Sequence, residues 1–130
     1  MNMDPVLVID VDIDEVYEVA GERGRACMLL FHGSADCDSF KGRILPGAVD
    51  TQKQENGSPN LISARYILEG RDHTGEECRI FIENNSLPES EYTRPLIYTD
   101  SYALKWLEAA ELCGAIKEKE GGVVILIYKK

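Results

Sequence analysis

The two side chains in this sequence that are best suited to bind a ligand or move a proton are an acid and a base, Asp50 and Arg65. Asp50 follows a Pro46-Gly47 turn, and Arg65 lies inside the strand-like run 61–68. A buried carboxylate with a raised pKa can orient a guanidinium or accept a proton. If both side chains face one interior, we expect Arg65 to hold an anionic group of a ligand, and Asp50 to orient Arg65 or move a proton.

This expectation depends on which face of the strand points inward. Side chains alternate along a strand, so Arg65 shares a face with Ser63 and opposes Tyr66. An inward guanidinium needs an anion, either Asp50 or a ligand carboxylate, because an unpaired buried charge costs several kcal/mol. In the opposite orientation Arg65 is an exposed surface residue and Asp50 is a local cap of its turn.

Four further side chains are candidate ligand-binding groups: Tyr66, Asn84, Tyr98 and Trp106. Asn84 ends the strand-like run 77–84, where its amide can project at the rim of a pocket or hold the following loop. Trp106 and the two tyrosines offer aromatic surface either to a ligand or to the core. For the single tryptophan, core packing is the more common use, because an amphipathic helix must bury one face.

Other common chemistries lack their motifs. No Ser has a His and an acid at suggestive spacing, and no Gly-rich phosphate loop follows a strand. The Asp-x-Asp-x-Asp run from Asp10 to Asp14 fails as a calcium loop, because Glu15 stands where the tight turn requires Gly. Four cysteines lie far apart without a C-x-x-C pair and are expected to be reduced, packed thiols. They are Cys27, Cys37, Cys78 and Cys113. We therefore expect no metal and no cofactor.

The elements that must position these residues are mostly strands. Segments with strand character recur at short intervals between turns rich in Gly, Pro, Asn and Asp, which is typical of a barrel or sandwich. The segments are 6–17, 25–32, 40–45, 61–68, 77–84, 97–99, 115–118 and 123–128. Residues 33–38 break the pattern, and the polar stretches 51–60 and 84–94 are expected to be loops. The pattern predicts a mainly β chain, a single antiparallel β-barrel.

One helix is expected near residues 101–113. Apolar residues recur there at helical spacing, Asp100 or Ser101 is available as an N-cap, and Gly114 provides a C-terminal stop. Trp106 lies on the apolar face of this predicted helix, which we expect to pack against the sheet.

Composition limits the class of protein. The chain has 130 residues, 14 Lys and Arg against 23 Asp and Glu, and a formal net charge of −9. This length fits one domain over residues 1–130, and the acidity disfavours nucleic acid as a partner. The start of the chain, Met1 to Pro5, has no basic residue, and no stretch approaches the ~20 apolar residues of a membrane span. We expect a cytoplasmic protein that does not bind membranes.

A series of motifs runs across nearly the whole chain. In order, they are Gly33, Phe40-x-Gly42, Leu45-Pro46-Gly47, Asp50, Ala64-Arg65-Tyr66, Asp72-x-x-Gly75, Asn84, Arg94-Pro95 and Tyr102-x-x-x-Trp106-Leu107. Their order and spacing resemble the bacterial and fungal family filed as domain of unknown function 3237. The chain departs from that family at Gly47-Ala48-Val49-Asp50-Thr51, where the usual pattern is Gly-Gly-x-Asp-Trp.

The resemblance implies an antiparallel barrel, lipocalin-like in appearance, that holds a helix and an interior cavity. It also implies that Asp50, Arg65 and Asn84 occupy matching motif positions, and activities proposed in the family look like lyase chemistry on small organic acids or aromatics. We therefore expect a barrel that binds a small carboxylate or aromatic molecule, with cofactor-independent decarboxylation, dehydration or isomerisation as the form any catalysis would take. A non-catalytic carrier and a structural subunit with a filled barrel are the alternatives. A homodimer is plausible for a barrel of this size.

Overall fold

The computed structural model describes residues 4–130, which form nine strands and one short helix. The elements are β1 (Leu7–Ala20), β2 (Gly24–Asp36), β3 (Phe40–Ile44), β4 (Val49–Glu55), β5 (Leu61–Asp72), β6 (Glu77–Ser86), β7 (Thr93–Thr99), α1 (Trp106–Ala109), β8 (Leu112–Lys119) and β9 (Gly122–Lys129). Within these residues no helix is long and apolar enough to cross a membrane.

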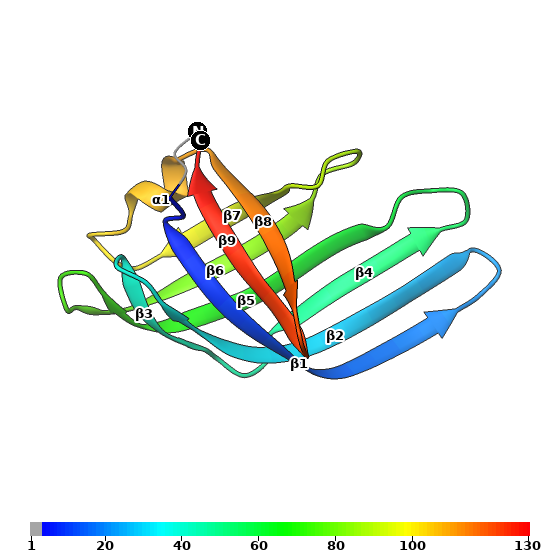
Figure 1. Ribbon diagram of the computed structural model, residues 1–130, viewed down its shortest axis with the longest axis horizontal. Coiled ribbons are helices and arrows are strands. Elements are labelled where there is room, and N and C mark those ends of the chain that lie inside the picture. The colour runs from blue at the N-terminus through cyan, green and yellow to red at the C-terminus, as the bar shows by residue number, and fades with distance from the viewer. Residues whose placement is uncertain (1–3) are drawn as a thin grey trace.

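The strands form a closed antiparallel barrel, as the sequence predicted (Figure 1). Their order around the sheet is β1-β9-β8-β7-β6-β5-β3-β2-β4, and β1 also pairs with β2. Strands β3 and β4 both lie between β2 and β5, one after the other. They therefore share one of the eight positions around the barrel.

Strand β1 has two halves with different neighbours. From Leu7 to Asp12 it pairs with β9, and from Ile9 onward it pairs with β2. The β1–β2 register shifts between Ile13 and Glu15, which marks a β-bulge, and beyond it β1 pairs with β2 alone. As a result, the tip of the β1–β2 hairpin projects away from the β8–β9 hairpin (Figure 1).

The core fills the end of the barrel that holds the first half of β1. Strict alternation along that half buries Leu7, Ile9 and Val11, while the intervening acids face outward. Phe40 and Leu68 are among the side chains buried with them. Each fully buried aliphatic side chain contributes ~1.5–3 kcal/mol, so this end of the barrel stabilises the fold.

The outward acids of β1 pair with side chains of neighbouring strands. The Lys119 ammonium donates to Asp10 Oδ1 at 2.6 Å and to Asp12 Oδ1 at 2.8 Å. His32 Nδ1 lies 2.7 Å from Asp14 Oδ1. The Asp-x-Asp-x-Asp run is therefore a paired outer face of the barrel.

Several predicted element boundaries are wrong, among them those of the expected loop 84–94, into which β6 extends as far as Ser86 and β7 from Thr93 onward. Residues 51–60 are not a loop, since β4 continues to Glu55, and β2 runs through the expected break as far as Asp36. The helix expected over 101–113 is one α-helical turn, Trp106–Ala109, and β8 begins at Leu112. Turns precede α1, and together residues 101–109 form a compact segment that we call the plug. Its apolar side chains Leu104 and Leu107 are buried.

Asp72 anchors this plug to the β5–β6 turn. Its Oδ1 accepts hydrogen bonds from the backbone N–H of Thr74 at 2.9 Å and from the Thr74 hydroxyl at 2.5 Å. Its Oδ2 accepts from the Ser101 hydroxyl at 2.7 Å, and Ser101 Oγ in turn accepts from the backbone N–H of Leu104. The hydroxyls of Thr74 and Ser101 stabilise the carboxylate and lower the pKa of Asp72 to about 2.

This pKa gives a testable pH dependence. A carboxyl whose pKa is depressed on folding contributes stability above its unfolded pKa of 3.8, and this stability is lost as pH falls toward 2. We expect urea unfolding of Asp72→Asn to show a smaller loss of stability than the wild type between those pH values. Asp38→Asn, which changes an exposed acid, should follow the wild type. Parallel curves for wild type and Asp72→Asn would contradict this role of Asp72.

Candidate functional site

A row of inward side chains crosses the barrel beyond the apolar core. The strand register places Asp50 directly opposite Ala64, and Ala64 directly opposite Asn84. Directly paired residues share a face, and Ala64 and Asn84 are both buried. Asp50 and Asn84 therefore face the same interior, on strands separated by two interstrand spacings, about 10 Å along the curved sheet.

Asp50 is oriented by a chain of two amides. Asn60 Nδ2 donates to Gln52 Oε1 at 3.1 Å, and Gln52 Nε2 donates to Asp50 Oδ2 at 2.9 Å. Asp50 Oδ1 is buried and has no hydrogen-bond partner within residues 4–130. Burial raises the pKa of Asp50, and the hydrogen bond from Gln52 offsets part of that rise. One carboxylate oxygen is thus fixed, and the other is left open to a donor.

Asn84 and Thr93 form the other side of the row. Asn84 is 3% exposed and Thr93 is 6% exposed, and both Asn84 Oδ1 and Thr93 Oγ1 are buried without a partner in the described chain. Thr93 pairs with Gly114 of β8. A Cβ on Gly114 would collide with Thr93 Oγ1 and crowd Asn84 Oδ1, so only glycine leaves room between these two oxygens.

Tyr66 lies one inward position closer to the core. It is two residues beyond Ala64 on β5, is 3% exposed, and packs edge-on against Phe31 with ring centroids 5.5 Å apart. Its hydroxyl has no hydrogen-bond partner within residues 4–130, and burial strongly raises its pKa. Tyr66 is therefore a neutral phenol that can both donate and accept a hydrogen bond.

These four oxygens define the candidate site, which we call the inner polar row: Asp50, Tyr66, Asn84 and Thr93. Leaving a buried polar atom unsatisfied costs ~1–3 kcal/mol, and folded proteins hold few such atoms. Asn60 Oδ1 is a fifth such atom, at the start of the amide chain. Their concentration on one face of neighbouring strands indicates a site that keeps its hydrogen-bonding capacity for another molecule.

Arg65 does not belong to this site, and the expected pair with Asp50 is wrong. Arg65 is exposed and lies opposite Val49 and Glu83, whereas Asp50 lies opposite Ala64. Alternation along β5 therefore sends the guanidinium to the outer face. A hollow of about 370 Å³ beside Arg65 is also lined mainly by outward residues such as Thr51 and Ser63.

Tyr98 and Trp106 also lie outside the inner polar row. Tyr98 is 59% exposed, and its ring lies 5.9 Å from that of Phe81. Trp106 is 38% exposed, and Lys129 Nζ lies over its ring, 5.6 Å from the centroid. The prediction that Trp106 packs in the core is therefore wrong. Of the six predicted site residues, the structure brings together Asp50, Tyr66 and Asn84.

The sequence analysis missed Thr93, Gln52 and Gly114. Thr93 and Gln52 fell in stretches interpreted as loops, so their alternation with neighbouring residues was not considered. Gly114 was interpreted as a helix stop. The signal that could have found them is the continuation of the strand pattern into polar sequence.

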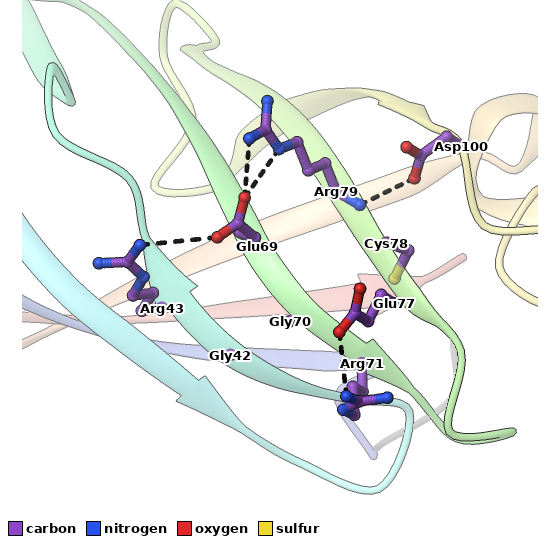
Figure 2. A pocket seen from close by; sticks show the side chains of 9 residues that line it. All are labelled: Gly42, Arg43, Glu69, Gly70, Arg71, Glu77, Cys78, Arg79 and Asp100. Carbon is purple, nitrogen blue, oxygen red and sulfur yellow. Dashed lines mark hydrogen bonds and ion pairs between the residues drawn. The ribbon is translucent and has the colours of Figure 1, made fainter.

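A surface hollow of about 640 Å³ is a charged groove on the outside of the barrel (Figure 2). Glu69 links three strands there, since its carboxylate lies 3.6 Å from Arg43 and accepts from Arg79 at 2.8 Å. Arg71 pairs with Glu77, and Asp100 accepts from the backbone N–H of Arg79. Because these charges satisfy one another, the groove is a brace across β3, β5 and β6.

No group of His, Cys, Asp or Glu within residues 4–130 is arranged to hold a metal ion. The four cysteines are free thiols, and Cys27, Cys78 and Cys113 are buried.

Comparison with solved structures gives the same barrel in proteins of low sequence identity. A protein of unknown function from Clostridium acetobutylicum matches with a TM-score of 0.80 and 23% identity, covering 97% of this chain and 96% of the other. A β-barrel-like protein from Acinetobacter baumannii matches with a TM-score of 0.73 and 19% identity over 97% and 93% of the two chains. An enzyme from Penicillium herquei matches with a TM-score of 0.68 and 13% identity over 98% and 94%.

At these identities the likeness is one of fold alone. No family model matches the chain, and no curated protein is found as a relative. Membership of the family of domain of unknown function 3237 stays a prediction from the sequence motifs.

The environment of Asp50 predicts an unusual effect of mutation. When folding raises the pKa of a carboxyl, the free energy of unfolding falls as pH rises from the unfolded value of 3.8 through the raised value. The ionised Asp50 carboxylate therefore destabilises the folded protein at neutral pH. We expect Asp50→Asn to melt a few degrees above the wild type at pH 7. The difference should shrink as the medium is acidified and the wild-type carboxyl takes up its proton. A lower melting temperature for Asp50→Asn at pH 7 would show that the ionised carboxylate stabilises the barrel.

Proposed function

We propose that the protein binds a small organic molecule inside the open end of the barrel, through the inner polar row. The observation that carries this proposal is the set of four buried oxygens on one interior face that lack hydrogen-bond partners within residues 4–130. A sheet packed only for stability would have apolar side chains at these positions, because unsatisfied polar atoms oppose folding. The solved neighbours support the barrel, and the proposal of binding rests on these side chains.

The chemistry of the row favours a ligand that donates hydrogen bonds. Asp50 and Asn84 present oxygen acceptors, and Tyr66 and Thr93 present hydroxyls. No Lys or Arg is buried among the described residues, and Arg25, which the register places on the inner face toward the open end, is already paired with Glu18, so no unpaired cation adjoins the row to balance a carboxylate ligand. Between the two ligand classes expected from the sequence, this arrangement favours an aromatic molecule with hydroxyl or phenol groups over a simple carboxylate.

Binding can be tested with Asn84→Leu, which removes the amide oxygen and keeps a similar volume. A thermal-shift screen of phenols and hydroxylated aromatics should give hits for the wild type. For those hits we expect Asn84→Leu to weaken binding about tenfold, or ~1.4 kcal/mol, because the ligand loses one hydrogen bond.

Arg65→Met is the matched control for this screen. It changes a prominent candidate residue on the outer face and should leave the affinity for the same hits unaltered. Equal affinity in the wild type and Asn84→Leu, together with a loss in Arg65→Met, would move the site to the outside of the barrel.

A catalytic role for Asp50 is the finer part of the proposal. A carboxyl with a raised pKa and one free oxygen is suited to move a proton to or from a bound molecule. The Penicillium herquei neighbour is an enzyme, so a barrel of this fold can hold an active site. In that form the protein would be a cofactor-independent lyase or isomerase, with Asp50 as the acid–base group and Asn84 as a binding group.

Proton transfer by Asp50 can be separated from binding by hydrogen exchange. Any hit from the screen is incubated with protein in D2O, and its C–H signals are followed by NMR. We expect the wild type to exchange or convert the ligand, and Asp50→Asn to bind it without doing so. Gln52→Leu should shift the pH midpoint of exchange upward, because it removes the hydrogen bond that lowers the pKa of Asp50. Binding without exchange or conversion in the wild type would identify a carrier.

A further inference from the structure

The second half of β1, from Asp14 to Ala20, is a free edge strand. Its pairing with β9 ends at Asp12, followed by one hydrogen bond from the Ile13 N–H to the Gly121 carbonyl. Beyond this point β1 pairs only with β2, and all seven residues are exposed. Along this edge, alternate backbone N–H and C=O groups point away from β2 with no strand of residues 4–130 beside them.

The edge carries only part of the protection that usually blocks pairing. Natural sheets protect long edges with charged side chains, Lys above all, with Pro, with a bulge within the strand, or with a covering loop. This edge has three acids, Asp14, Glu15 and Glu18, so its pairing requires a register that keeps them from lying opposite one another. No Pro or Lys occurs between Asp14 and Ala20, and the bulge lies at the beginning of this stretch, between Ile13 and Glu15. Val16, Tyr17 and Val19 within this stretch are β-branched or aromatic, and such side chains favour strand pairing.

Apolar side chains flank the edge on the outer face of the sheet. Tyr17 pairs with Met28, and these side chains are 59% and 47% exposed. Val19, at 74% exposed, and Leu61, at 45%, line a hollow of about 590 Å³ between the β1–β2 and β4–β5 hairpins. A contiguous exposed patch of this kind marks an interaction surface.

The acidic side chains of the edge are partly neutralised within the protomer. Asp14 lies against His32, and Glu18 accepts a hydrogen bond from Arg25 at 3.1 Å. Arg23 and Lys53 also line the adjoining hollow. These basic residues offset part of the acidity at this end of the molecule and so lower the repulsion that a second copy of the same acidic chain would meet.

We propose that a second copy of this chain pairs antiparallel with the β1 edge, with the two-fold axis at Tyr17. A two-fold axis that relates two antiparallel copies of one strand passes through a residue that lies opposite its own copy, since directly paired side chains share a face. Each possible centre therefore fixes a complete set of pairs, and these sets differ in how they place the acids.

Only the centre at Tyr17 uses the whole edge and keeps the acids apart. With Tyr17 opposite Tyr17, Glu15 lies opposite Val19, and the ends of the stretch pair with each other. A centre at Asp14, Glu15 or Glu18 places an acid opposite its own copy, and a centre at Val16 places Asp14 opposite Glu18. A centre at Val19 pairs three residues only. Like charges directly opposite are destabilising, so the Tyr17 register is favoured.

The mass in solution tests the interface. We expect twice the protomer mass of 14.5 kDa for the wild type by light scattering or sedimentation. Tyr17→Lys should raise the dimer dissociation constant at least tenfold, because it places two ammonium groups at the axis. Tyr17 is 59% exposed, so the variant should fold, and at concentrations low enough for both proteins to be monomers its melting temperature should match that of the wild type. Tyr102→Lys, which changes a tyrosine that is 82% exposed elsewhere, is the control and should dimerise as the wild type does.

Cysteine cross-linking tests the register. In the proposed pairing the two copies of residue 17 have Cβ atoms about 4.5–5.5 Å apart, close to the span of a disulfide. The two copies of residue 19 lie four residues apart along the strand, roughly 14 Å. Mild oxidation should therefore link Tyr17→Cys into a covalent dimer in high yield, and should leave Val19→Cys at the wild-type background.

Three results would overturn the proposal. The first is a monomer at every concentration up to the solubility limit, which would leave this edge to another partner or to solvent. The second is a dimer that Tyr17→Lys does not weaken, and the third is equal or stronger cross-linking of Val19→Cys. None of these outcomes bears on ligand binding by the inner polar row, because Tyr17 points to the outer face.

Discussion

The pairing of β1 on both of its sides is the constraint on which the rest of this structure depends. Where β9 and β2 both bond to β1, from Ile9 to Asp12, the barrel is closed around a dense apolar core. Where the pairing with β9 stops, at Asp12 and Gly122, the bulge after Ile13 turns β1 outward with β2. One strand thus divides the molecule into a closed end that supplies stability and an open end where polar side chains remain unpaired.

This division explains how the barrel tolerates the inner polar row. Asp50, Asn84 and Thr93 bear unsatisfied buried oxygens, which oppose folding, while neighbouring side chains toward the closed end are apolar. Proteins commonly hold destabilising groups at functional sites on a scaffold that is stable elsewhere. The amide chain from Asn60 through Gln52 adds to this interpretation, because it fixes the direction of a carboxylate that burial alone would disfavour.

The sequence predicted the barrel because its alternation and turns are local signals, and three of its six candidate site residues belong to the inner polar row. Asn84 shares a strand face with Ile80 and Ile82, so its inward direction followed from spacing alone. The relation of Asp50 to Arg65 did not follow, because it depends on which residue of β4 lies opposite which residue of β5. A shift of one position exchanges the two faces. In the structure Asp50 lies opposite Ala64, and this places Arg65 outside.

The helix shows a case in which the local sequence pattern was clear but long-range contacts limited the helix to one turn. Residues 101–113 have helical spacing, but Ser101 is held by Asp72, and Leu112 and Gly114 are needed in β8 opposite Lys129 and Ile127. These long-range contacts leave only one turn of α-helix. Neither contact leaves a local signal in the sequence, so tertiary packing overrode a favourable pattern.

The open end and the free edge of β1 are consequences of the same bulge, and this connects the two proposals. A two-fold axis through Tyr17 runs perpendicular to the sheet, so it places the inner faces of both β1–β2 hairpins on the same side of a continuous sheet. Val16, which is 54% exposed, belongs to that inner face, as its pairing with Leu29 shows. In the dimer the open ends of the two barrels would therefore adjoin, with Val16 of each copy opposite Glu18 of the other on the inner face. A ligand larger than one barrel can enclose would then contact both copies, whereas a small one would bind each barrel independently.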